Sequence, residues 1–143
     1  MRLTTKGRYG LRVMIDMSLH EGDEWLSVND ISKRQNISFP YVEQLVVQLK
    51  KAGLVESIRG PQGGYRLSKP ASEISAGEVI RIVEGPLEIV HCAGKTKEEC
   101  ERSGKCATQI LWTKISQQMA QILDNISLKE LAKWEKELKE KTG

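Results

Sequence analysis

The sequence lacks any hydrophobic run long enough to cross a membrane, because no stretch approaches eighteen consecutive apolar residues. Its opening residues, MRLTTKGRYGLRV, also lack the apolar segment and small-residue cleavage pattern of a secretory signal peptide. We therefore expect a cytoplasmic protein with no membrane partner. Cysteine is scarce as well. Three thiols cannot all pair within one chain, and cytoplasmic thiols are kept reduced, so a disulfide framework is not expected.

The usual signatures of an enzyme are missing from the sequence. It has no Cys-x2-Cys pair, no glycine-rich phosphate loop after a strand, and no thiol–histidine–acid set in an evident framework. A redox carrier or sulfur-transfer catalyst built on three thiols therefore ranks well below a binding protein, and we predict no enzymatic activity. The length of 143 residues fits one ordinary domain, or a small domain with an appended arm.

The charge is unevenly distributed along the chain. Residues 1–70 carry eleven Lys and Arg against seven Asp and Glu, whereas residues 71–143 carry eleven against twelve. A basic amino-terminal half is typical of proteins that bind a polyanion. The bias is weak by itself and gains weight only from the elements that the same half predicts.

The amino-terminal half predicts a helix-turn-helix. Apolar residues recur at helical spacing over residues 7–20, and a short helix follows with Ser27 as a candidate cap. Asn36 is suited to a left-handed stop, and Ser38 to the cap of a second amphipathic helix that ends at Gly53. A short helix, a tight turn and a second helix with a polar leading end form the helix-turn-helix layout.

A basic hairpin and a long helix complete the predicted fold. Residues 54–55 and 65–67 read as short strands around the loop RGPQGG, which would form the wing of a winged helix. Residues 75–83 predict a further helix, and a long helix begins near residue 107 with a nearly heptad-like apolar stripe. The stripe has little later sequence to pack on, so a second chain is expected to cover it. Its members are Ile110, Leu111, Ile115, Met119, Ile122, Leu123 and Ile126.

The predicted fold class is therefore mainly α with a small β-hairpin wing. We divide the chain into a winged helix-turn-helix domain over residues 1–84, a cysteine-rich loop over residues 85–106, and a dimerisation helix with a charged tail over residues 107–143. The lysine- and glutamate-rich end of the tail receives no packing role.

Ten residues are candidates for contact with double-stranded DNA. The polar residues of the second helix that we expect to point away from its core face are Ser38, Tyr41, Glu43 and Gln44. On this outer face Gln44 can form paired hydrogen bonds with adenine, and Glu43 can accept from cytosine. Arg59 at the tip of the hairpin suits a narrow minor groove. Basic residues near these elements would neutralise phosphates. The candidates are Ser38, Tyr41, Glu43, Gln44, Arg59, Gly60, Lys6, Arg8, Lys50 and Lys51.

All three cysteines lie in one polar segment, CAGKTKEECERSGKC, as Cys92, Cys100 and Cys106. Thiolates bind iron–sulfur clusters, zinc or copper(I), and three of them leave one position for another ligand. Neighbouring lysines would favour the thiolate form of the cysteines. The spacing alone does not separate a cluster from zinc.

Several runs resemble the IscR-type iron–sulfur cluster regulators, to which NsrR and CymR are related. They are MRLTTKGRYGLRVM, ISKRQNIS, EQL, RGPQGGY, GEVI and the three cysteines followed by LW, and they extend over residues 1–131. The resemblance implies a homodimeric winged-helix transcription regulator that controls genes for cluster biogenesis, with a [2Fe–2S] cluster on the three cysteines. It also implies base reading at Glu43 and Gln44 and a minor-groove contact at Arg59. Cluster assembly proteins are expected as further partners.

The sequence departs from the IscR pattern at the fourth ligand. The pattern has a histidine three residues after the last cysteine, where this chain has Gln109, and it has five residues between the first two cysteines instead of seven. Gln109 is the candidate by position, and His91 is an alternative that adjoins Cys92. A cluster-free repressor of the CymR type, regulated by a partner protein or by thiol oxidation, therefore stays open, as does a zinc site.

Overall fold

The computed structural model describes residues 3–22, 25–90, 101–102 and 104–142 of the chain. Within these ranges the chain forms six α-helices, one short 3-10 helix and a two-stranded antiparallel sheet. The helices are α1 (Thr5–Leu19), α2 (Val28–Gln35), α3 (Phe39–Lys51), α4 (Ala76–Glu84), α5 (Ala107–Asp124) and α6 (Leu128–Thr142), the 3-10 helix η1 is Ala71–Glu73, and the strands are β1 (Val55–Ile58) and β2 (Gly64–Leu67).

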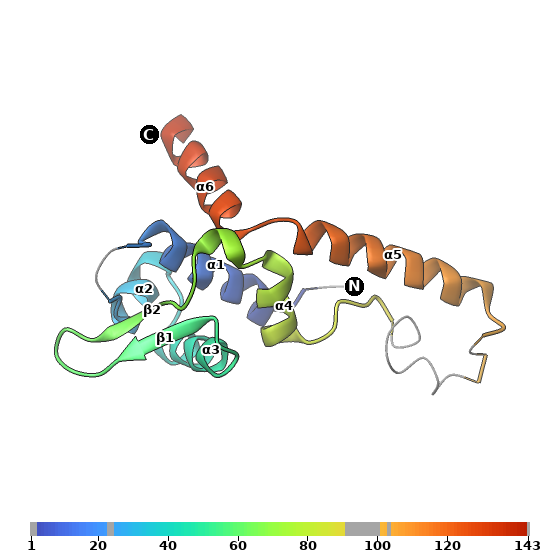
Figure 1. Ribbon diagram of the computed structural model, residues 1–143, viewed down its shortest axis with the longest axis horizontal. Helices are drawn as coiled ribbons and strands as arrows, with labels where there is room; N and C mark the ends of the chain where they lie inside the picture. Colours follow the sequence, from blue (N-terminus) through green and yellow to red (C-terminus); the bar gives the residue numbers. More distant parts are fainter. Residues whose placement is uncertain (1–2, 23–24, 91–100, 103, 143) are drawn as a thin grey trace.

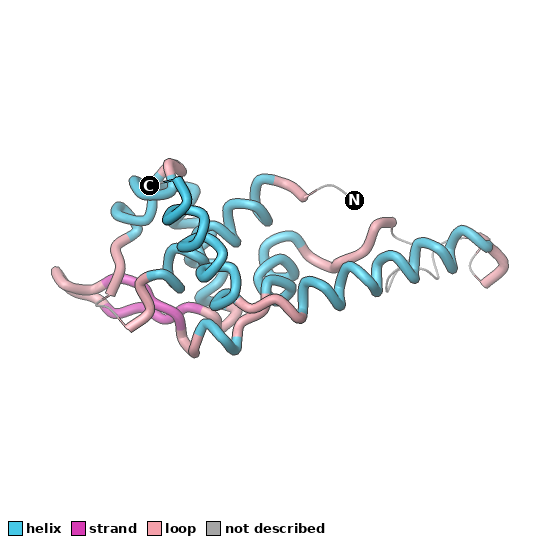
Figure 2. The backbone as a smooth tube through the Cα atoms, turned by 90° about the horizontal axis from the view of Figure 1, so that it is seen from above, coloured by secondary structure: helices cyan, strands magenta, loops and turns pink. Residues whose placement is uncertain are grey.

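The molecule has two regions that differ in shape. The body consists of α1 to α4, η1, the hairpin and α6, and occupies the left of Figure 1. The arm consists of α5 with residues 86–90 beside it, and extends to the right, away from the body (Figure 1). The view from above in Figure 2 shows the same separation.

Local sequence signals place the helix-turn-helix where they predict it. The Ser27 side chain accepts from the Asp30 N–H and caps α2, which ends at Asn36 with a left-handed φ of 54°. The helix α3 follows after Ser38, although the Ser38 side chain makes no capping hydrogen bond. Pro40 lies in the first turn of α3, where its missing N–H needs no partner. These features confirm the predicted turn between the two helices.

The body is built around α1, which packs against α2, α3, α4 and α6. One face of α3 supplies Val42, Leu45, Val46 and Leu49 to the core, each at most 2% exposed. They pack in the same cluster with four further buried residues, which are Val13, Met14 and Met17 of α1 and Ile31 of α2. Burying one such side chain contributes about 1.5–3 kcal/mol, so packing against α1 fixes where α3 lies.

A buried carboxylate ties α1 to the helix-turn-helix. Asp16 of α1 is 1% exposed and accepts two hydrogen bonds from the Arg34 guanidinium, at 3.0 and 2.7 Å, and one from the Gln35 amide at 2.9 Å. The same contacts raise the pKa of Arg34, first through its hydrogen bond to Asp16. A carboxylate with this many donors is compensated for its burial, so the end of α2 is held at a defined position on α1.

The carboxy-terminal segment packs on the body at its start and leaves its charged end on the surface. It forms α6, which returns from the arm to pack along α1 (Figure 1). Leu128 is fully buried and Ala132 is 6% exposed, while the lysines and most of the glutamates are exposed. Both buried residues of α6 lie before Lys133, and none of residues 133–141 is buried, in line with the expectation for the charged end of the tail.

The arm leaves the body at a tightly made joint. Arg81 of α4 donates two hydrogen bonds to Asp124 at the end of α5, at 2.6 and 2.9 Å. The backbone of Ala76 donates to Ile126 at 2.8 Å, and that of Leu128 donates to Ile74 at 2.8 Å. A Cβ at Gly77 would collide with the Asp124 carboxylate, so glycine allows α4 and α5 to approach this closely.

Candidate DNA-binding surface and cysteine segment

The outward face of α3 carries the predicted base-reading residues. Glu43 and Gln44 are exposed, on the side opposite the buried Val42 and Leu45. Together with Val47, Gln48 and Lys51 they line one shallow depression. The Gln48 amide anchors its edge by donating to the Ile82 carbonyl at 2.8 Å. The structure thus brings these two candidates together on a surface that is fixed from behind by the core.

The sequence predicts that Tyr41 points away from the core face of α3, but the structure shows that it does not. Its side chain is half-buried, and its ring meets the edge of the Tyr9 ring at a centroid distance of 5.6 Å. The position lies at the border of the apolar face of α3, and an aromatic ring there is covered more favourably by α1 than by water. Tyr41 therefore joins the leading end of α3 to the first turns of α1.

The contact between the two tyrosines also brings Lys6 and Arg8 near α3. Both basic side chains are exposed in the first turns of α1, within one turn of Tyr9. Lys50 and Lys51 are exposed in the last turn of α3, where positive charge is favourable for the helix dipole. The four cationic candidates are therefore exposed, two in the first turns of α1 and two in the last turn of α3.

The position of Lys6 and Arg8 depends on a residue that the sequence did not single out. Glu84, at the end of α4, accepts from the N–H groups of Thr4 at 2.9 Å and Gly7 at 2.8 Å, and from the Thr4 hydroxyl. Burial opposes ionisation, but these hydrogen bonds and the charge of Lys6 outweigh it and lower the pKa of Glu84. The carboxylate caps the first turn of α1 from across the body.

The hairpin forms a wing beside α3, as predicted. Val55 pairs with Leu67 and Ile58 with Gly64, so the turn over residues 59–63 projects beyond the sheet (Figure 1). Arg59 and Gly60 are exposed at this turn, and Gly60 has φ +116°, a conformation that other residues rarely adopt. The arginine is thus presented at the tip of a thin loop.

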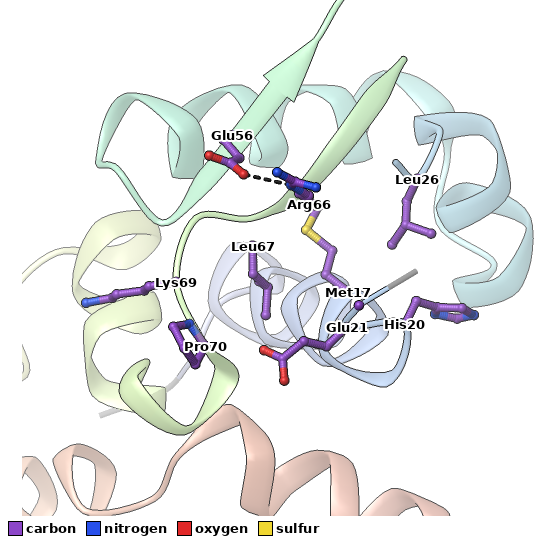
Figure 3. A pocket seen from close by; sticks show the side chains of 10 residues that line it. Met17, His20, Glu21, Leu26, Glu56, Arg66, Leu67, Lys69 and Pro70 are labelled. Carbon is purple, nitrogen blue, oxygen red and sulfur yellow. Dashed lines mark hydrogen bonds and ion pairs between the residues drawn. The ribbon is translucent and has the colours of Figure 1, made fainter. Parts of the chain in front are cut away.

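The residues that line a cleft at the base of the wing support the hairpin. Figure 3 shows Glu56 and Arg66 reaching across the two strands, with Met17 and Leu67 beneath them. Arg66 donates to Glu56 at 2.7 Å and lies over the Trp25 ring at 4.0 Å, while Glu21 accepts from the Ala71 N–H at 2.6 Å. Arg66 and Glu56 thus pair with each other across the strands, and Glu21 binds the backbone that follows them, so these charged groups hold the base of the wing in place.

The described part of the cysteine segment places one thiol at a helix amino terminus. Cys106 is half-buried, precedes α5 and lies 2.9 Å from the Thr108 hydroxyl. The hydrogen bond with Thr108, backbone N–H groups of α5 and the charge of Arg102 lower the pKa of Cys106. The Gln109 side-chain oxygen accepts from the Gly104 N–H at 3.0 Å, one turn along α5. A thiolate is favoured here.

The other members of the predicted ligand set, Cys92, Cys100 and His91, lie outside the described residues. In the part of the chain that is described, no three His, Cys, Asp or Glu residues come together as a metal site. Because two of the three cysteines fall outside that part, the ligand set predicted from sequence stays a prediction.

The arm leaves most of its apolar stripe uncovered. Ile110 and Ile122 are 61% and 59% exposed, and Leu111 and Ile115 are also exposed. A flank of α5 meets residues 86–90, where the Ile89 N–H donates to the buried Ser116 hydroxyl at 3.1 Å. None of the described helices is both long and apolar enough to span a membrane.

An exposed polar helix face beside a hairpin with an arginine at its tip defines a winged-helix DNA-binding protein. The Rrf2 family, described as iron-dependent transcriptional regulators, matches residues 3–134. The chain belongs to this family.

Relatives and solved structures agree with the family assignment. The chain is 47% identical to the HTH-type transcriptional regulator IscR of Yersinia pseudotuberculosis, over 92% of this chain and 79% of the relative. It superimposes on CymR, the global cysteine regulator of B. subtilis, with a TM-score of 0.79, 39% identity and coverage of 94% and 98% of the two chains. IscR of T. potens gives a TM-score of 0.76, 36% identity and coverage of 93% and 87%.

Proposed function

We propose that the protein is a homodimeric cytoplasmic transcription regulator that binds operator DNA and senses iron–sulfur cluster status. In this proposal α3 enters the major groove, Glu43 and Gln44 read base edges, and Arg59 enters the adjacent minor groove. Ser38, Gly60 and the basic candidates on α1 and α3 contact the phosphate backbone of the DNA. The observation that carries the proposal is the exposed face of Glu43 and Gln44 on α3, next to which the wing lies. The membership of the chain in a family of transcriptional regulators supports it.

The stripe on α5 supports the homodimer. Four large aliphatic side chains are exposed along one helix, although isoleucine and leucine are usually buried. A second copy of α5 would cover them, and two-fold symmetry would present two recognition helices to a palindromic operator. The IscR and CymR relatives have the same fold over nearly the whole chain, arm included.

The cysteine segment would hold a [2Fe–2S] cluster through Cys92, Cys100 and Cys106, with Gln109 as the fourth ligand. The described residues fit this role, because Cys106 is only partly buried, favoured as thiolate and one helical turn from Gln109. When bound, such a cluster supplies a redox-active and oxidation-sensitive group. The amide of Gln109 is a weaker ligand than the histidine of the IscR pattern, which would make the site more labile.

Binding of a cluster to the cysteine segment would influence DNA binding through the arm. The segment lies between the body and the start of α5, and the end of α5 is fixed to α4 by Arg81 and Asp124. Binding or loss of a cluster at the start of α5 would therefore alter how the two bodies of the dimer sit relative to one another. Regulation requires that the two occupancy states differ in DNA affinity.

Anaerobic purification tests the proposal. We expect a coloured protein with iron and sulfide in equal amounts, about two of each per chain, and loss of the colour in a variant with serine at the three cysteine positions. Footprinting the same promoters with cluster-bound and cluster-free protein should give different affinities or different protected sites. A colourless, iron-free protein with unchanged operator affinity after reconstitution would contradict the cluster function.

A second candidate is a cluster-free repressor that resembles CymR, regulated by a partner protein or by thiol oxidation. Gln109 in place of a histidine favours it, as do the solved CymR structures at 39–42% identity, one of them of the oxidised form. It predicts operator binding by iron-free protein that weakens when Cys106 is oxidised and recovers with thiol reductant. Metal analysis of the same preparation separates the two functions and also detects zinc.

A further inference from the structure

Val47 is an apolar side chain at the centre of the polar face of α3. Successive helical residues turn by about 100°, which places Val47 on the side opposite the buried Val42, Leu45 and Leu49. Its side chain is 38% exposed, so the chain itself leaves much of it uncovered. Valine supports a helix less well than the lysine, glutamine or glutamate residues around it. Neither packing nor helix propensity therefore explains this residue.

The surroundings of Val47 point to a nucleic-acid base. It lines the same depression as Glu43 and Gln44, one turn before it, and Lys51, one turn after it. Major-groove edges combine hydrogen-bonding atoms with a single apolar group, the C5-methyl of thymine. A depression that offers an amide, a carboxylate and an aliphatic patch side by side matches that combination.

We propose that Val47 is a specificity-determining residue that packs against the methyl group of a thymine. The inference rests on the proposed function, in which α3 reads operator DNA. Val47 lies three residues beyond Gln44, or about 4.5 Å along the helix axis, compared with about 3.4 Å between base pairs. The thymine therefore lies about one base-pair step from the adenine that Gln44 pairs with. Gln44 and Val47 together select an A·T-rich step, and Glu43 selects the neighbouring cytosine.

The test removes the methyl group from the DNA and the side chain from the protein in separate steps. An operator is first selected from a random pool with the wild-type dimer, and each thymine is then replaced by deoxyuridine. We expect one position per half-site where wild-type affinity falls about fourfold, the magnitude of burying one methyl group. Val47→Ala should lose a similar factor on the thymine operator and be insensitive to deoxyuridine at that position.

Two controls make the coupling specific. Gln44→Ala should weaken binding and yet keep its sensitivity to the thymine methyl. Leu138→Ala, which truncates a side chain that is 62% exposed on α6, should bind both operators as the wild type does. Thermal unfolding and the oligomeric state of Val47→Ala should match the wild type, because Val47 lies outside the core.

The outcomes distinguish this inference from the proposed function. One outcome overturns the thymine contact alone. In it, binding to the selected operator depends on Gln44 and Arg59, but the loss of affinity from Val47→Ala and the loss from deoxyuridine multiply when they are combined, as independent changes do. The same holds if Val47→Ala binds the operator as tightly as the wild type, which would leave the depression to a protein partner. A selection that enriches no sequence overturns both.

Discussion

The body and the arm differ in how much of their apolar surface the chain covers by itself. In the body, α3 buries four large residues to at most 2% exposure, and even the charged α6 buries Leu128. In the arm, α5 is the longest helix of the described chain, and its single buried residue is Ser116. The body is thus specified by its own core, whereas the arm has a surface that becomes stable only against a second molecule.

The largest expected effect is on the arm. Ile115→Glu with Ile122→Glu should raise the dimer dissociation constant by about a hundredfold or more, because each carboxylate would be buried without a partner. Light scattering would report monomers, and circular dichroism would report unchanged helix content in the body. The control is Gln117→Glu with Gln121→Glu, which adds the same charge to another side of α5. If the isoleucine variant stays dimeric, the stripe is not the interface.

The body should respond to the loss of a core side chain instead. Leu49→Ala should lower the free energy of unfolding by about 2–5 kcal/mol, since Leu49 is fully buried between α3 and the rest of the core. Urea unfolding measures this, with Leu138→Ala on the surface of α6 as the matched leucine control, expected within about 0.5 kcal/mol of the wild type. Equal losses in the two variants would contradict the difference between the regions.

The joint between the two regions should be sensitive to one methyl group. Gly77→Ala would place a Cβ against the Asp124 carboxylate and push the Arg81–Asp124 pair apart, at a cost of about 1–3 kcal/mol. Urea unfolding measures the loss. Asp124→Ala combined with Gly77→Ala should recover part of it, because the obstructing carboxylate is gone. Additive losses in the double variant would show that the close approach is not the cause.

The smallest expected effect is pH-dependent and belongs to the first turn of α1. Glu84 has a lowered pKa in the folded protein, so it stabilises the fold above its ordinary pKa, and this stabilisation disappears as the pH falls through the lowered value. Glu84→Gln should therefore cost about 0.5–1 kcal/mol at neutral pH and nothing in strong acid. Stability curves over pH measure this. Glu137→Gln, an exposed acid on α6, should show no such pH dependence.

Much of the body could be predicted because its signals are local. Ser27 and Asn36 specify a cap and a left-handed stop within a few residues of themselves, and the apolar period of α3 identifies its buried side. The exposure of Glu43, Gln44 and Arg59 follows from the same period and from the hairpin turn. Tyr41 was misjudged because its position at the border of that face depends on Tyr9, 32 residues earlier in the chain.

The remaining contacts join residues too distant in sequence to be recognised from it. Glu84 accepts from Thr4, 80 residues earlier in the chain, and Arg81 pairs with Asp124, 43 residues later. In a charge-rich sequence each carboxylate could pair with many different hydrogen-bond donors. Only the packing of α4 against α1 and α5 determines which donor each of these two carboxylates meets.

The sequence by itself determined the order of the helices, the recognition face and the wing, because periodicity, caps and turns act over a few residues. Only the tertiary structure decided that α6 closes the body and that Glu84 holds the first turn of α1. The physical reason is that burial and ion pairing depend on which distant surfaces meet, and local sequence does not encode that choice.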